Sequence, residues 1–226
     1  MKKIAFSDKY GLTNAVIQGH KTMTRRIING DYVEIKAYNA DGDWHFIADT
    51  NDGDSIELKP NYQIGEEVAV AQRYKDCGWD PDTLQETFIR KPTVFPDLDP
   101  FDEHSGWIDL PLKYHKGWTN KMFVLANLMP YNIIITDIKV ERLQDISDED
   151  ILREGILQSC DGIDLFTFDG WIKRHKGDVL PTQIYTQNRR NAFAALIDRI
   201  CGRGTWERNP WVFAYSFKVK RASGFK

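Results

Sequence analysis

The chain is poor in the residues and motifs that mark several large protein classes. Its 226 residues include three cysteines and five histidines, all far apart in the sequence. Neither set has the spacing of a disulfide framework or a zinc site, so we expect reduced, mostly buried thiols and no metal. The sequence also lacks a glycine-rich phosphate loop, a dinucleotide-binding fingerprint and a nucleophile elbow. These absences exclude several common nucleotide-dependent and hydrolytic enzyme classes.

Long hydrophobic runs are missing as well. No window approaches the roughly 18 consecutive apolar residues of a membrane helix, and the apolar stretch near residue 4 is too short for a signal peptide. We therefore expect a cytoplasmic protein without a membrane partner. The hydrophobic share of 42% and charged share of 28% are ordinary for a folded chain, and they leave the oligomeric state open.

Charge is distributed unevenly along the chain. The net charge of −3 argues against a protein whose whole surface binds duplex nucleic acid. Positive residues gather near both ends, within residues 2–26 and 199–221, and acidic residues gather between them. If the two ends of the chain meet in space, they are expected to form one basic face.

Hydrophobic patterning predicts an α+β fold. Strands are expected where apolar residues alternate or run together between turns, and helices where they recur at helical spacing. Ser147 is well placed to cap a helix that starts with three acids. We expect a single domain over 1–226, a curved or barrel-like antiparallel sheet with helices at its rim, and irregular insertions at about 76–117 and 156–185. The expected strands cover 2–6, 31–39, 43–49, 54–59, 62–75, 131–143 and 210–221, and the expected helices 11–21, 147–156 and 187–202.

The stretch GHKTMTRR at residues 19–26 is a candidate for chemistry. Lys21 and Thr24 are three positions apart and can point into one site. As a base, Lys21 has to be neutral, and lowering its pKa from about 10.4 to about 7–8 costs roughly 4 kcal/mol. Only burial and neighbouring cations such as Arg25 and Arg26 can supply that shift. The alternative interpretation is a basic loop that ends a helix.

Two further regions hold candidate residues. Glu154 precedes a glycine where a helix is expected to end, and by itself is typical of an exposed acid. Trp206 lies between Arg203 and Arg208 in an expected loop, where it can stack on a base while the arginines neutralise phosphate. The alternative is that Trp206 anchors the core, like the alternating aromatic residues of the strand at 210–221.

Three ordered stretches give the chain a family resemblance. AVIQGHKTMTRR, ITDIKVERLQDISDEDILREGI and NPWVFAYSFKV resemble the ASCH domain, a relative of the PUA domain, in the longer version found in phages and prophages. The match covers about half of the chain. The resemblance implies a PUA-like β-barrel with flanking helices and a cleft that binds RNA, nucleotides or modified nucleosides without a cofactor.

One bacterial branch of this family hydrolyses N(4)-acetylcytidine with a lysine, a threonine and a glutamate. The resemblance places these on Lys21, Thr24 and Glu154. Ligand contacts are then expected from the rest of the first motif and from the region before the last strand: Thr22, Arg25, Arg26, Arg203, Trp206 and Arg208. Three functions stay open: binding of RNA or a nucleoside in a basic cleft, metal-independent amidohydrolysis of an acylated cytidine-type nucleoside, and ribonuclease activity.

Overall fold

The computed structural model describes residues 1–40, 42–79, 88–92, 107–111, 113, 116–158, 166–167, 186 and 188–223. These residues form a mixed α+β fold with a five-stranded mixed sheet and a three-stranded sheet, and no closed barrel is detected among them. The α+β class predicted from the sequence is therefore confirmed.

The five-stranded sheet has the order β1-β6-β9-β12-β2. Its bounds are β1 Lys3–Ile4, β6 Glu67–Val70, β9 Tyr131–Arg142, β12 Trp211–Arg221 and β2 Met23–Ile27. The β1–β6 pair is parallel and the other pairs are antiparallel. Because β12 pairs with β2, the two basic ends of the chain do meet, and β2 is left as an edge strand.

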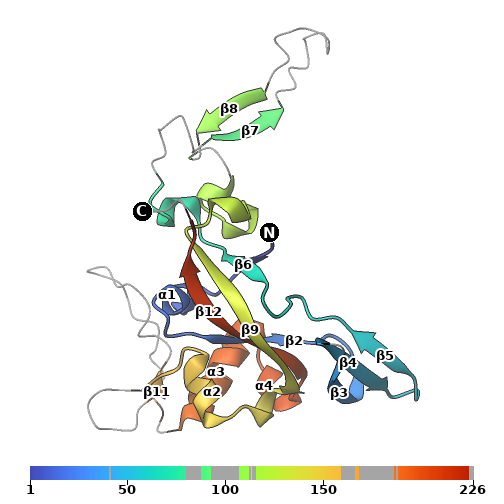
Figure 1. Ribbon diagram of the computed structural model, residues 1–226. Helices are drawn as coiled ribbons and strands as arrows, with labels where there is room; N and C mark the ends of the chain where they lie inside the picture. The colour runs from blue at the N-terminus through green and yellow to red at the C-terminus, as the bar shows by residue number, and fades with distance from the viewer. Residues whose placement is uncertain are drawn as a thin grey trace.

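The three-stranded sheet consists of β3 Tyr32–Ala40, β4 Asp43–Thr50 and β5 Ser55–Leu58, all antiparallel. In Figure 1 it projects to one side of the five-stranded sheet. Its attachment is apolar, since Ile35, Phe46 and Ala48 are buried in the main core and the ring of Phe46 packs edge-on against Phe213. These strands agree with the predicted meander.

Four helices accompany the sheets: α1 Leu12–Ile17, α2 Asp148–Arg153, α3 Arg189–Cys201 and α4 Thr205–Arg208. Figure 1 shows α2, α3 and α4 together on one side of the molecule. The predicted cap of α2 is confirmed, because the Ser147 hydroxyl accepts a hydrogen bond from the Asp150 backbone N–H at 3.1 Å. Helix α1 ends before Gly19, which has φ of 76°.

Several local predictions were wrong. Residues 23–27 form an edge strand instead of a loop, because Met23 and its neighbours find backbone partners on β12. Trp206 lies in the short helix α4 instead of a loop. Within the two expected irregular insertions, short strands pair as β7 Phe88–Pro92 with β8 Trp107–Pro111, and as β10 Leu157–Gln158 with β11 Phe166–Thr167. Most of both insertions lies outside the described residues.

Short 3-10 helices connect the remaining elements: η1 Tyr74–Asp76, η3 Lys116–Trp118, η4 Lys121–Phe123, η5 Ala126–Leu128 and η6 Leu143–Asp145. Buried apolar residues form one large core between the sheets and helices, and a smaller one around Tyr74 and Met129. Cys77 and Cys201 are free thiols, the first half-buried and the second exposed, so the expectation of buried thiols was wrong for Cys201. Cys160 lies outside the described residues.

Candidate functional site

The start of β2 is tied by backbone hydrogen bonds to the ends of two helices. The Lys21 N–H donates to the Ala15 carbonyl of α1 at 3.0 Å, and the Thr22 N–H donates to the Arg153 carbonyl of α2 at 2.9 Å. These two bonds bring the end of α2, at Glu154, against Lys21. Backbone hydrogen bonds alone thus hold together two residues that are 133 positions apart in sequence.

The side chains of Lys21 and Glu154 form a buried ion pair. Lys21 Nζ lies 2.5 Å from Glu154 Oε2 and 2.7 Å from the Glu154 carbonyl oxygen. Their side chains are only 2% and 5% exposed. The predicted partnership of these two residues across the fold is therefore present as a direct contact.

Gly155 makes room for this contact. Its φ of 97° lies in the region that favours glycine, and it lets the chain turn sharply where α2 ends. A Cβ added at Gly155 would lie 3.5 Å from Lys21 Cβ, so the glycine backbone packs directly against the lysine stem. The EGI sequence therefore sets both the end of the helix and the position of Lys21.

A cavity of about 240 Å³ opens beside the ion pair. One wall is the apolar stripe of α3, in which Phe193, Leu196, Ile197 and Ile200 recur at helical spacing. Phe6 and Leu12 also line it. Polar groups are contributed by Ser7, Lys21, Thr24, Arg25, Arg26, Glu154 and Cys201. Thr24 is 5% exposed and shares the cavity with both members of the ion pair.

The cavity meets β2 along the free edge of the strand. Four consecutive residues, 24–27, line it, although neighbouring side chains of a strand point to opposite faces. The Ile28 N–H donates to the Trp211 carbonyl, and the Thr22 carbonyl accepts from the Phe217 N–H. The backbone N–H and C=O groups of the even-numbered residues of β2 therefore point toward β12. The backbone N–H and C=O of Arg25 consequently point away from β12, at the free edge of the sheet.

The environment of Lys21 shifts its pKa in the direction that a base requires. Burial lowers the pKa, the Glu154 carboxylate acts against this, and the charges of Arg26 and Arg25 lower it further. The net pKa is below the ordinary value of lysine. The condition derived from the sequence, burial together with neighbouring cations, is met.

Arg25 lines the cavity, but its guanidinium is held in a cluster of carboxylates. Its side chain is 1% exposed, and its guanidinium contacts Glu141, Glu154 and Asp150. Burial works to lower the pKa of Arg25, but Glu154 and Glu141 outweigh it and the net pKa is raised. Lys139 and Arg153 bind the same Asp150 carboxylate from the outside.

Arg26 lines the cavity, whereas Thr22, also predicted as a ligand contact, is not among the lining residues. Arg26 Nη2 donates to the Ala5 carbonyl at 3.0 Å, and the guanidinium lies 5.7 Å from the centre of the Phe6 ring. The Thr22 hydroxyl accepts a hydrogen bond from Arg153 Nε at 3.4 Å. Of the two arginines in the motif, Arg26 is therefore the one available to a ligand that enters the cavity.

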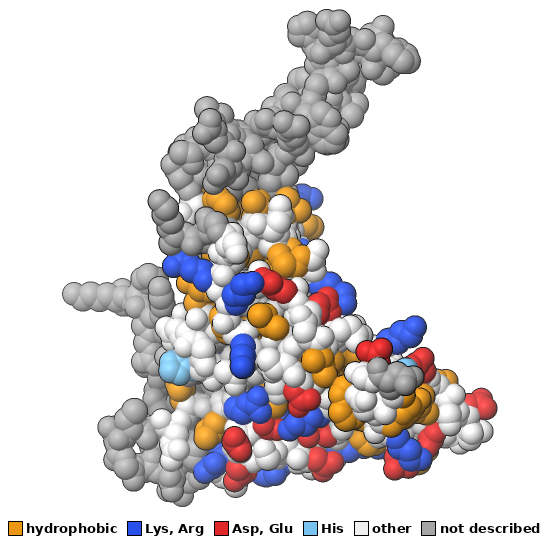
Figure 2. Space-filling model, in the orientation of Figure 1, with side chains coloured by type: hydrophobic (Ala, Val, Ile, Leu, Met, Phe, Trp, Pro, Cys, Tyr) orange, Lys and Arg blue, Asp and Glu red, His pale blue; other side chains and the backbone are white. Residues whose placement is uncertain are grey.

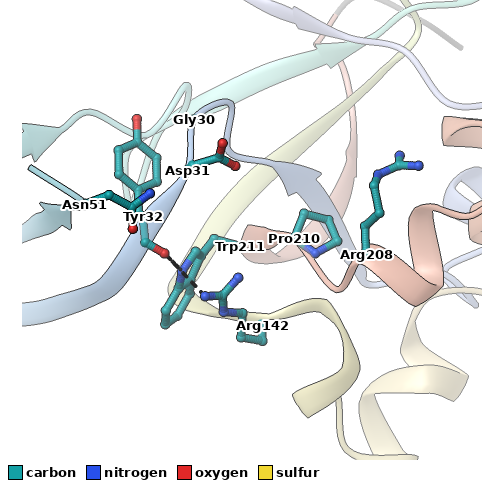
Figure 3. Close-up of a pocket in the computed structure, with 8 residues that line it drawn as sticks. All are labelled: Gly30, Asp31, Tyr32, Asn51, Arg142, Arg208, Pro210 and Trp211. Atoms are coloured by element: carbon teal, nitrogen blue, oxygen red, sulfur yellow. Dashed lines mark hydrogen bonds between the residues drawn. The ribbon is translucent and has the colours of Figure 1, made fainter.

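The three predicted contacts before the last strand lie away from this cavity. Trp206 packs edge-on against Phe193, at 5.9 Å between ring centres, which agrees with its alternative role in the core. Arg203 is exposed. Arg208 lines a second, open pocket of about 380 Å³ (Figure 3), where it donates to the Thr205 hydroxyl.

The second pocket has its own arrangement of side chains. Arg142 lies 4.4 Å above the Trp211 ring, and both residues donate hydrogen bonds to the Tyr32 carbonyl (Figure 3). Asp31 lines the same pocket. The arginine is thus already engaged by the protein.

The face of the molecule shown in Figure 2 carries mixed charge, since basic and acidic side chains are interspersed over its lower half. On β12, Lys220 is paired with Glu67 at 3.1 Å. Of the helices in the described part of the chain, none has both the length and the apolar character needed to cross a membrane.

Comparison of the chain with protein-family models, with curated proteins and with solved structures gave no match in any of the three. Among the residues that the structure describes, no group of three or more His, Cys, Asp or Glu side chains is placed to hold a metal ion. The candidate site is therefore interpreted from its own geometry, together with the three motifs.

Sequence reasoning missed two parts of the site. The apolar stripe of α3 was predicted as a core face, and nothing in its spacing signals that it also forms a cavity wall. The carboxylate partners of Arg25, Glu141 and Asp150, were not singled out. Glu141 is the last residue but one of β9, and Asp150 is the one α2 acid at a buried helical position.

Proposed function

We propose that this cavity binds a modified nucleoside and that Lys21, Thr24 and Glu154 hydrolyse an acyl group from its exocyclic amine. The observation that carries the proposal is the buried contact between Lys21 and Glu154, at 2.5 Å, beside a cavity that Thr24 also lines. Residues of the three types that the ASCH-like motifs imply are thus gathered in one enclosed place.

The shape of the cavity supports a ligand the size of a single base. Its volume of about 240 Å³ is below the roughly 300–1,000 Å³ of typical drug-sized sites. A flat, partly apolar ring suits the stripe of α3, and a base edge with donors and acceptors suits the outward-facing backbone of Arg25. Arg26 is placed to contact a ribose or phosphate at the border.

The proposed reaction needs only the residues of the site and water. Neutral Lys21 takes the proton of the Thr24 hydroxyl, and the Thr24 oxygen bonds to the acyl carbon. The carbon–nitrogen bond then breaks, and the amine leaves with the proton returned by Lys21. Water cleaves the threonine ester, releasing the carboxylic acid and restoring Thr24. Thr24 can alternatively position the attacking water, with Lys21 as the base.

Glu154 serves this reaction through its contact with Lys21. Its carboxylate stabilises the charged lysine that forms when the proton is taken, and it orients Nζ. The lowered pKa of Lys21 supports the neutral form from which the reaction starts. Burial therefore favours the neutral lysine that starts the proton transfer, and the charge of Glu154 favours the protonated lysine that the transfer produces.

Binding without catalysis is the second candidate. It is favoured by the fact that Lys21 donates to two oxygens of Glu154, an arrangement that also suits a charged lysine with a purely structural role. In that case a nucleoside or single-stranded RNA occupies the cavity intact. Affinity for RNA should then fall as salt rises.

The PUA-like family assignment and the barrel that it implies belong to the same proposal. The three motifs lie on β2 and the segment before it, on β9 to α2, and on β12, which are neighbours in the fold. No observation among the described residues favours the ribonuclease alternative over the other two. RNA incubated with the protein and a chelator tests that alternative.

The discriminating experiment is incubation with N(4)-acetylcytidine and related N-acyl nucleosides, followed by chromatography of the free nucleoside. The wild type should release the amine, and Lys21→Ala should lose at least a hundredfold in rate, the scale of general base catalysis. Lys36→Ala is the control, because Lys36 is an exposed residue of the three-stranded sheet. No wild-type turnover across the panel would rule out the hydrolase and leave binding.

A further inference from the structure

Arg25 has no free face for an incoming anion. Its Nε and Nη2 donate to Glu141 Oε1 at 2.9 and 2.5 Å, and its Nη1 donates to Glu154 Oε1 at 3.0 Å. Nη2 also lies 3.3 Å from Asp150 Oδ2. All three guanidinium nitrogens are therefore directed at carboxylates of the protein itself, in a side chain that is 1% exposed.

The two oxygens of Glu154 are shared between two cations. Oε1 accepts from Arg25, and Oε2 accepts from Lys21. A carboxylate held at only one oxygen can rotate about its last bond, but one held at both is fixed in its plane. Since Glu141 and Asp150 fix Arg25 in turn, the direction of Glu154 is set from β9 and α2.

We propose that Arg25 is a positioning residue for the Lys21–Glu154 pair: it aims Glu154 Oε2 at Lys21 Nζ and takes no part in binding phosphate. This inference deepens the proposed function and rests on it for its catalytic consequence. The ligand-facing cation of the motif is then Arg26 alone.

The charges around Lys21 define what the loss of Arg25 does. Glu154 at the end of α2 and the charges of Arg25 and Arg26 on β2 act on the pKa of Lys21, and Cys201 on α3 lines the same cavity. Removing Arg25 takes away a like charge, which raises the pKa of Lys21. It also frees Glu154 Oε2 to rotate away from Lys21 Nζ, which lowers that pKa.

Two variants separate positioning from bulk structure. Arg25→Lys keeps a positive charge, but a single ammonium group cannot bridge Glu141 and Glu154 as the guanidinium does. Arg25→Met removes the charge as well. Arg190→Lys is the control for an arginine-to-lysine change, because Arg190 is half-exposed, and its guanidinium donates to the backbone carbonyls of Gln144 and Ile146 just before α2.

The experiment follows the lysine directly and does not depend on turnover. The Lys21 pKa is read from the carbon NMR shift of labelled lysine, with the signal assigned by its absence in Lys21→Met. Arg25→Lys keeps the positive charge but lets Glu154 turn away from Lys21, so we expect the Lys21 pKa to fall in this variant. In Arg25→Met the loss of the like charge acts on that pKa in the opposite direction. Arg190→Lys should match the wild type.

Kinetics supply the second readout. With an N-acyl nucleoside, Arg25→Lys should lower kcat at least tenfold with KM within about twofold. A Lys21 pKa that stays unchanged in folded Arg25→Lys overturns the positioning role. An Arg25→Lys variant that binds a nucleotide more weakly than the wild type, but binds the matching nucleoside normally, also overturns it, because Arg25 would then contact the phosphate. If the wild type turns over no substrate but the pKa moves as expected, the proposed function fails while the positioning role stands.

Discussion

Removing Glu154 should lower the free energy of unfolding more than removing Lys21, its partner in the buried ion pair. Glu154→Gln leaves Lys21 and Arg25 buried without the carboxylate that both contact. Removing one partner of a buried ion pair typically costs about 3–5 kcal/mol, because an uncompensated charge remains. Lys21→Met leaves Glu154 still bound to Arg25, so its cost should stay near the 1.5–3 kcal/mol of a hydrogen bond to a charged group.

The pH dependence of the larger cost follows from the same contacts. Without Glu154, the pKa of Lys21 should fall further below its ordinary value, since the carboxylate is the charge that raises it. The unfolded chain then binds more protons than the folded one, and stability rises with pH. The loss of unfolding free energy in Glu154→Gln should therefore become smaller as the pH rises, up to the pH that equals the pKa of Lys21 in the wild type.

Urea unfolding followed by circular dichroism, at several pH values from 6 upward, measures both effects. The expected order is wild type, Lys21→Met, then Glu154→Gln, with the two variants converging at higher pH. A Lys21→Met variant as unstable as Glu154→Gln, or a Glu154→Gln deficit that grows with pH, would refute the reasoning.

Three further predictions test neighbouring features. The Asp150 pKa is lowered, because hydrogen bonding and charge from its cationic partners outweigh burial. The stability that Asp150 contributes is therefore present above about pH 3.9 and is lost as the pH falls through the folded pKa. Acid unfolding of Asp150→Asn should show a correspondingly flatter pH profile. Gly155→Ala should lower the free energy of unfolding by about 1–2 kcal/mol because of the positive φ, and it should also weaken ligand binding through Lys21. Gly53→Ala is the control, since Gly53 has φ of 87° and open space around it. It should cost a similar amount in thermal unfolding and leave binding intact. Trp206→Phe should leave RNA affinity in a filter assay unchanged, and a large loss would show that Trp206 stacks on bases.

The sequence was most informative where one physical signal dominates. The long apolar strand at β9, the Ser147 cap and the apolar stripe of α3 were each predicted from local pattern, because periodicity and capping are local properties. The pairing of Lys21 with Glu154 came from the family resemblance, since no spacing rule connects residues that far apart.

The remaining parts depend on tertiary context. A stretch as polar as residues 21–26 reads as a loop, and only its pairing with β12 makes Met23–Ile27 a strand. Arg25 and Arg26 are indistinguishable in sequence and both line the cavity, yet only the guanidinium of Arg25 is buried among carboxylates. The placement of Trp206 depended on α4, a helix of four residues that is too short to give a periodic signal.

The most direct test of the central claim is the turnover of N(4)-acetylcytidine by two variants of Thr24. Thr24→Ser keeps a hydroxyl at this position of the cavity that Lys21 also lines, and Thr24→Val keeps the shape of the side chain without it. The account predicts that the wild type and Thr24→Ser release cytidine, while Thr24→Val loses at least a hundredfold in kcat and still binds the nucleoside. Equal turnover by Thr24→Val and the wild type would contradict it.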